Sequence, residues 1–185
     1  MTREAATGEE SYEVVLLVEQ ALTDVDATQV RSLHQELDDD PTIQVAYHVL
    51  FPMTDAAAAV EASLGVMGGA DLMAPPQPPD AEEVARLRED FEHQAESDLE
   101  ASVRVLVAAG ATVASTTVVE GSAVDALIEK VAEVDGREAI ILTRPHVVAE
   151  FFHVDWTSRA RRKLGVPVLH LLEHETFVEQ SEDRR

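Results

Sequence analysis

The chain has 185 residues and carries 36 aspartates and glutamates against 14 lysines and arginines, a formal net charge of −22 at pH 7. A chain of this length suits one domain, which buries roughly 70% of the surface that its unfolded form exposes. The sequence has no cysteine, which excludes disulfides, thiolate metal sites and a cysteine nucleophile. So acidic a surface repels DNA, RNA and anionic membranes. We therefore predict no nucleic-acid partner and no membrane partner.

Nothing near the start of the chain resembles a targeting segment. Residues 1–12 are polar and lack the apolar centre of a signal peptide, and no apolar run approaches the length of a membrane span. We expect a disordered lead-in over 1–12 and a cytoplasmic protein. Only two of the bases are lysines, Lys130 and Lys163. Acidic, lysine-poor surfaces suit a high-salt cytoplasm as well as ordinary solubility, and composition leaves that choice open.

The first third of the chain reads as strand, helix, strand. Residues 14–18 are continuously apolar, a pattern typical of a strand buried on both faces. Val30, Leu33 and Leu37 then follow at helical spacing and predict one modest helix. Residues 43–51 form the second predicted strand.

Residues 52–79 have the weakest pattern. They contain a run of alanines, a pair of glycines and a cluster of prolines, a composition that favours an insertion ending in a stiff linker.

The longest predicted helix begins at Asp80, with Glu83 three residues on as its capping-box partner, and ends at Gly110. Over 80–104, nine acids face three arginines, so its outer face is solvated. Its inner face is a stripe at steps of three and four residues, formed by Val84, Leu87, Phe91, Ala95, Leu99, Val103 and Leu106.

The remainder continues the alternation. A third strand is predicted over 112–120, a helix from Gly121 and Ser122, and a fourth strand over 139–143. The fifth predicted strand begins at Val166 and ends at Leu172, before a charged tail over 174–185. Strands joined by right-handed helical crossovers predict a three-layer α/β/α fold with a five-stranded, mostly parallel, Rossmann-like sheet.

Three loops are expected at one edge of this sheet. In such folds, ligands bind beyond the carboxyl ends of the strands, where the strand order reverses. The loops after the first, third and fourth strands cover residues 19–26, 120–121 and 143–157. They should share that edge.

Three motifs carry a family resemblance. Residues 14–19 form an apolar strand that ends in an acid, 119–123 form a strand-to-helix turn, and 166–169 form a proline-containing last strand. In this order and spacing the chain resembles the universal stress protein (UspA-like) family over residues 13–173, apart from 52–79. The resemblance implies a single domain with the fold of the adenine-nucleotide alpha-hydrolases.

The resemblance also implies a degenerate ATP-binding loop. ATP-binding members carry the pattern Gly-x2-Gly-x9-Gly-[Ser/Thr] after the fourth strand, and the matching positions here are Thr143, His146, Trp156 and Thr157. Three glycines are replaced, although glycine is what lets a backbone come close to phosphates. The acid that follows the first strand in the family corresponds to Glu19.

The same loop has two interpretations. Asp155 is suited to cap a helix whose free N–H groups could receive an anion, and bases gather nearby at Arg144, Arg159, Arg161, Arg162 and Lys163. A remodelled nucleotide or anion site would use Glu19, Gly121, Thr143, Arg144, His146, Trp156, Thr157 and Ser158. We favour the other interpretation, in which these bases pair with the acidic long helix or with another subunit.

Metal and catalytic chemistry find little support. His146, His153, His170 and His174 are close in sequence, but an i,i+4 pair flanking a strand end does not share a face as it does on a helix. We expect no metal site and no resident cofactor, with ATP as the one candidate ligand. No motif names a nucleophile, so we expect no enzyme, although a weak ATPase activity stays open.

Three functions follow as hypotheses. The favoured one is a stress or regulatory module that has lost glycine-loop ATP binding and acts through protein partners or as a homodimer, paired along the strand from Val166 to Leu172. The alternative is a nucleotide-responsive protein with a remodelled cleft. The third is an enzyme that uses the 52–79 insertion as a lid.

Overall fold

The computed structural model describes residues 10–38, 40–54, 80–143 and 164–172. Its strands form one parallel sheet in the order β3-β2-β1-β4-β5. Along the chain they are β1 (Glu10–Val18), β2 (Ile43–Pro52), β3 (Thr112–Val119), β4 (Glu138–Thr143) and β5 (Val168–Leu172).

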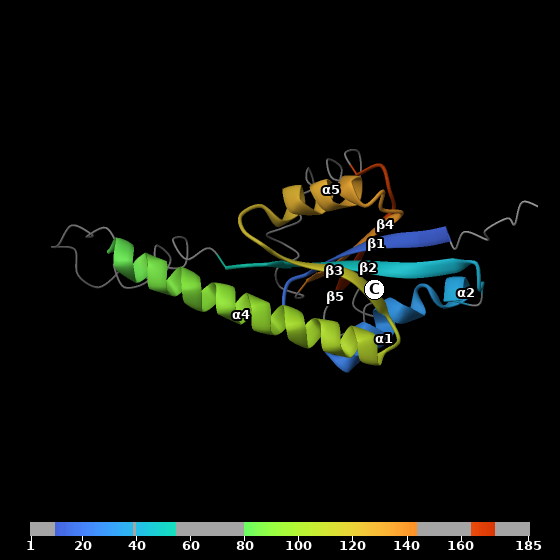
Figure 1. Ribbon diagram of the computed structural model, residues 1–185, viewed down its shortest axis with the longest axis horizontal. Helices are drawn as coiled ribbons and strands as arrows, with labels where there is room; N and C mark the ends of the chain where they lie inside the picture. Colours follow the sequence, from blue (N-terminus) through green and yellow to red (C-terminus); the bar gives the residue numbers. More distant parts are fainter. Residues whose placement is uncertain (1–9, 39, 55–79, 144–163, 173–185) are drawn as a thin grey trace, which may run out of the picture.

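Helices cover both faces of this sheet (Figure 1). One face carries α5 (Ala123–Glu133), and the other carries α1 (Asp24–Ser32), α2 (Gln35–Asp38) and α4 (Ala81–Ala108). The predicted three-layer fold with a five-stranded sheet is therefore confirmed, and its five described strands are all parallel. Among the described helices, none is long and apolar enough to cross a membrane.

The core has two halves, one on each face of the sheet. Val14, Leu16 and Val18 of β1 belong to the apolar cluster beneath α1 and α4, whereas Val15 and Leu17 belong to the cluster beneath α5. This alternation buries β1 on both sides, as its unbroken apolar sequence predicts.

β1 begins earlier than the apolar run that revealed it. The backbone N–H of Glu10 donates to the carbonyl of Thr42 over 2.8 Å, and Glu10 is in register with Ile43 of β2. The disordered lead-in predicted over 1–12 is therefore wrong for its last three residues. Parallel pairing extends a strand regardless of side-chain polarity, whereas the predicted boundary rested on polarity alone.

The single helix predicted around Val30, Leu33 and Leu37 is divided in two. Thr23 caps α1 through a capping box with Asp26, and Leu33 ends the helix. α2 begins two residues later, at Gln35. The break places His34 in a buried contact with Tyr47 and Glu138.

α4 has the predicted ends. The side chain of Asp80 accepts from the N–H of Glu82 over 3.1 Å rather than pairing with Glu83 as predicted. Gly110, at φ +87°, follows the C-cap residue Ala109, in the left-handed region that glycine adopts without strain.

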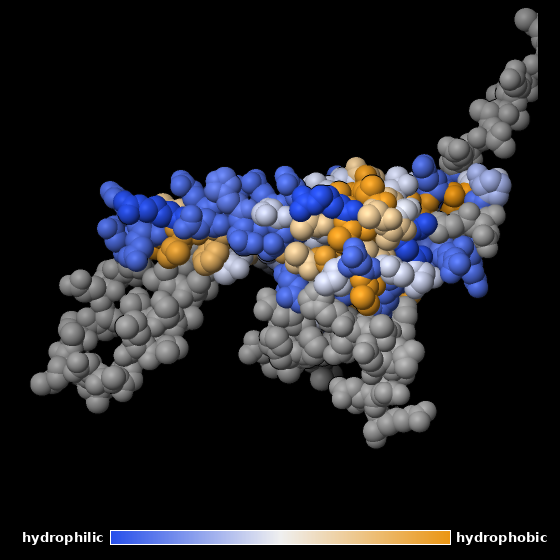
Figure 2. Space-filling view, turned by 90° about the horizontal axis from the view of Figure 1, so that it is seen from below, coloured by the Kyte–Doolittle hydropathy of each residue, from blue (hydrophilic) through white to orange (hydrophobic). Residues whose placement is uncertain are grey.

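The apolar stripe of α4 is buried only where the helix crosses the sheet. Ala95, Leu99 and Leu106 are buried. Val84, Leu87 and Phe91, nearer the amino end, are only half-buried. The reason is visible in Figure 1, where the amino-terminal half of α4 projects past the strands. The outer surface of this half is largely hydrophilic, as the view from below shows (Figure 2).

Three predictions concern residues outside the part of the chain that the structure describes. The insertion predicted over 52–79 lies outside the described residues from 55 onward. The helix that Asp155 is suited to cap also lies outside them up to residue 163, and the tail over 174–185 does so entirely.

Candidate functional site at the carboxyl edge of the sheet

The strand order reverses between β1 and β4. The chain moves outward from β1 to β2 and β3, then returns to the other side of β1 with β4 and continues to β5. The ends of β1 and β4 lie side by side, with Val18 in register with Leu142. A crevice beyond these two ends is where an open parallel sheet binds its ligands.

Glu19 lies at this reversal point, as predicted. Its backbone N–H donates to the carbonyl of Leu142 over 3.2 Å, which holds it against the end of β4. Its side chain is half-buried. Glu19 and Thr143, the last residue of β4, are thus brought together.

Thr143 has a buried side chain with a definite partner. Its hydroxyl lies 2.7 Å from Nε2 of His170 on β5, and the residue is only 6% exposed. This residue is the one that the sequence aligns with the first glycine of the family's loop pattern. In the structure its side chain makes a contact between β4 and β5. From the sequence, His170 was weighed as a metal ligand and lay in the fifth predicted strand, and its contact with Thr143 was not predicted.

Gly121 lies at the same edge but farther along it. Its φ is +80°, and an added Cβ would meet nothing within 4 Å. It precedes Ser122, whose side chain accepts from the N–H of Asp125 and caps α5. Because β2 lies between β3 and β1, Gly121 is separated from Glu19 by two strand spacings, about 10 Å.

The other predicted site residues lie outside the described part of the chain. They are Arg144, His146, Trp156, Thr157 and Ser158.

Sequence reasoning missed a polar row on the α5 face. Nε2 of His48 lies 2.7 Å from Oε2 of Glu13, and its Nδ1 lies 2.7 Å from Oγ of Ser115. A register shift in the pairing of β2 with β3 skips Ala114 and sets Ser115 opposite His48, which is how a β-bulge redirects a side chain. Ser115 is half-buried and lies within a strand rather than on a sharp turn. We interpret the row as a contact that ties three strands together.

A second polar cluster lies on the opposite face. Nδ1 of His34 is 2.8 Å from the hydroxyl of Tyr47, and its Nε2 is 3.1 Å from Oε2 of Glu138. The hydroxyl of Tyr12 donates to the same carboxylate over 3.5 Å. Burial raises the pKa of Tyr12 above its ordinary value, and the charge of Glu138 raises it further. Both clusters join residues far apart in sequence, so no spacing motif could have revealed them.

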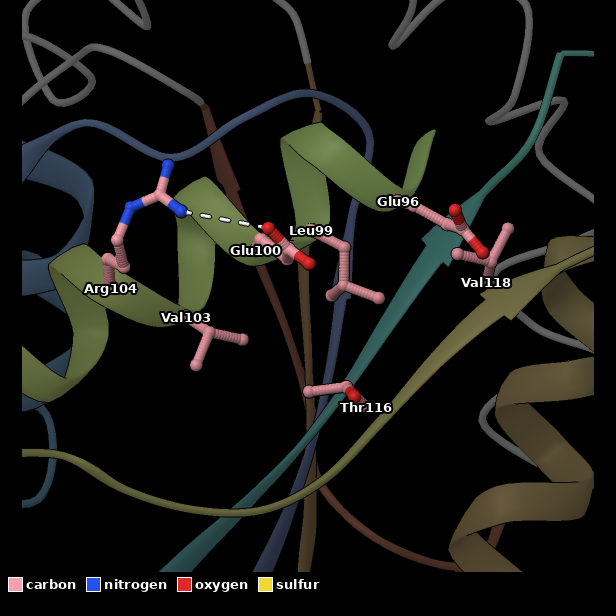
Figure 3. A pocket seen from close by; sticks show the side chains of 7 residues that line it. All are labelled: Glu96, Leu99, Glu100, Val103, Arg104, Thr116 and Val118. Atoms are coloured by element: carbon pink, nitrogen blue, oxygen red, sulfur yellow. Dashed lines mark ion pairs between the residues drawn. The ribbon is translucent and has the colours of Figure 1, made fainter. Parts of the chain in front are cut away.

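A groove of about 620 Å³ lies between α4 and the outer strand β3 (Figure 3). Because β3 is at one end of the described sheet, this groove is not at the reversal point. It is lined by Glu96, Leu99, Glu100, Val103, Arg104, Thr116 and Val118.

No family model and no curated protein matches the chain. Its five parallel strands with flanking helices have the fold of a universal stress protein.

Individual structural neighbours are universal stress proteins at low sequence identity. A universal stress protein family member from Arabidopsis thaliana with AMP bound is 10% identical, with a TM-score of 0.51 over 88% of this chain and 92% of that one. The universal stress protein from Archaeoglobus fulgidus is 15% identical, with a TM-score of 0.46 over 86% and 93%. A family member from Burkholderia pseudomallei is 17% identical, with a TM-score of 0.45 over 90% and 98%. The likeness to the Arabidopsis protein, at 10% identity, establishes the fold alone.

Proposed function

We propose that this chain is a universal-stress-protein-like regulatory module that acts through a homodimer or protein partners and does not bind ATP through a glycine loop. The contact between Thr143 and His170 carries this proposal. A phosphate can approach a backbone closely where no side chain intervenes, and here the first loop position holds a buried threonine bonded to β5. The proposal includes no catalytic step and no resident cofactor.

The terminal strand β5 supports the homodimer part of the proposal. β5 is its terminal strand on this side, among the described strands. The carbonyl of Pro167 accepts from Ala139 of β4 over 3.0 Å. Because backbone groups alternate in direction along a strand, those of Val168 point to the outer edge. A second copy could pair with them there.

We expect Val168→Pro to convert a dimer to a monomer. The substitution removes an N–H group that points outward, so the pairing of β5 with β4 remains and the fold is retained. Sedimentation velocity at micromolar concentration measures the change in mass. Val168→Thr keeps the N–H group and a β-branched side chain, and should remain dimeric. A monomeric wild-type protein would contradict the β5 dimer.

A nucleotide-responsive protein is the second candidate. The juxtaposition of Glu19 with Thr143 at the reversal point favours it, as does the AMP bound to the Arabidopsis protein of like fold. The cleft would combine Glu19 and Gly121 with Arg144, Thr157 and Ser158.

Titration calorimetry with Mg-ATP and with AMP separates the two candidates. The favoured proposal expects no saturable heat up to millimolar nucleotide. A micromolar dissociation constant, on the order of −8 kcal/mol, would establish the second candidate instead. Arg144→Ala should then weaken binding, whereas Arg86→Ala, which removes an equal charge from the exposed face of α4, should not.

A further inference from the structure

The groove between α4 and β3 has an apolar floor and an acidic rim. Leu99 and Val103 of α4 point toward β3, where Thr116 and Val118 lie (Figure 3). Leu99 is buried and Val103 and Val118 are half-buried. The groove could therefore receive the apolar side chains on one face of a bound segment.

The adjoining edge of β3 offers hydrogen bonds. In the described sheet, β3 pairs with β2 alone. The carbonyl of Val119 accepts from Met53 over 2.9 Å, so the backbone of Val119 faces β2. By alternation, the N–H and C=O groups of Thr116 and Val118 face outward. The same two residues line the groove with their side chains, so one extended segment could satisfy both.

The bulge limits where such a segment can pair. The register of β3 against β2 shifts between Val113 and Ser115, and is regular from there to Val119. A bulge protects an edge against unselective pairing. The regular stretch left open is the one that borders the groove.

The charged residues on the rim of the groove favour one kind of partner. Glu96 and Glu100 stand on the α4 side with their side chains 55% and 77% exposed. The one base of the rim, Arg104, lies 3.9 Å from Glu100 and is thereby balanced. On a chain of net charge −22, this rim attracts a cationic segment and disfavours a second copy, whose own α4 acids would be brought against it.

We propose that this groove binds an extended basic segment of a partner protein, which adds to β3 as a sixth strand and inserts alternate apolar side chains between α4 and β3. The inference rests on the proposed role of a module that acts through protein contacts. It names a surface at the opposite end of the sheet from β5, so Val168→Pro leaves it intact and the two proposals can fail separately.

A fluorescent peptide of about eight residues, in which valine and lysine alternate, is the probe, because every second side chain of a strand faces one way. We expect saturable binding by fluorescence anisotropy at physiological salt. A peptide of identical composition with its valines and lysines in separate blocks controls for unselective attraction to the acidic protein. A third peptide, N-methylated at alternate residues along one edge, tests the backbone pairing. Both should bind at least about tenfold more weakly.

Charge reversal tests the rim in the protein. Glu96→Lys with Glu100→Lys should weaken binding of the alternating peptide by about tenfold or more. Glu83→Lys with Asp90→Lys makes the same change of net charge at exposed acids of α4 outside the groove, and should have a much smaller effect. Circular dichroism confirms that both double variants remain folded.

Three outcomes would overturn the proposal. Equal binding of the alternating and block peptides would mean unselective attraction, and equal loss in both double variants would mean the same. A change in oligomeric mass on reversal of Glu96 and Glu100, without peptide binding, would assign the groove to a second copy.

Discussion

Leu142→Ala is expected to lower the free energy of unfolding by about 2–5 kcal/mol. Leu142 is fully buried in β4, and its register neighbours on the same face are Val18 of β1 and Leu171 of β5. Truncation removes the transfer free energy of the leucine side chain and leaves a cavity. The neighbouring strands cannot move in to fill it, because they are hydrogen-bonded to one another. A loss of this size is a large fraction of the roughly 5–15 kcal/mol that stabilises a typical domain.

Urea unfolding at fixed ionic strength measures this change, with Val107→Ala as the matched control. Val107 is 55% exposed on α4, so its truncation should change the free energy of unfolding by less than about 0.5 kcal/mol. Similar losses in both variants would mean that Leu142 is not in the core described here. Leu142 also accepts the backbone bond of Glu19, so a reduced nucleotide or partner response in Leu142→Ala should be assessed at matched fraction folded.

The fold was predictable because its strands are unusually apolar. Residues 14–18 and 139–142 are continuous hydrophobic runs, which few structures other than a buried parallel strand accommodate. The helix ends at Asp80, Gly110 and Ser122 were equally predictable, because helix capping depends on residues close together in the sequence. The capping partner of Asp80 is Glu82 and not the predicted Glu83, which is a local error. The errors at Glu10 and at the break before His34 depend on partners distant in sequence, which a local pattern does not record.

The site was only partly predictable, for a related reason. The order of the elements along the chain predicts that Glu19 and Thr143 lie at one sheet edge, and the structure brings them together. The order of the elements does not predict that the hydroxyl of Thr143 contacts His170, because that contact crosses from β4 to β5. The polar row of Glu13, His48 and Ser115 needs a bulge in addition. Its position could not be read from any spacing.

His34→Leu is the second substitution with a large expected effect. His34 is 2% exposed and bonds through one ring nitrogen to Tyr47 and through the other to Glu138. Leucine leaves the buried hydroxyl of Tyr47 and the largely buried carboxylate of Glu138 without this partner. Each loss costs about 1–3 kcal/mol, more for a charged group. We therefore expect the free energy of unfolding to fall by at least about 2 kcal/mol.

A double-mutant cycle with Tyr47→Phe separates the hydrogen bond from the packing. Removing both partners leaves fewer unsatisfied groups than the two single variants together, so the double variant should lose less than their sum by about 0.5–3 kcal/mol. Tyr12→Phe is the control, because its bond to Glu138 is long at 3.5 Å and only partly buried, and it should cost at most about 1 kcal/mol. Additive losses in the cycle would mean that the contact contributes no coupling energy. Coupling, in contrast, would show that His34 joins the break after α1 to β2 through Tyr47, in addition to its contact with Glu138 at the amino end of β4.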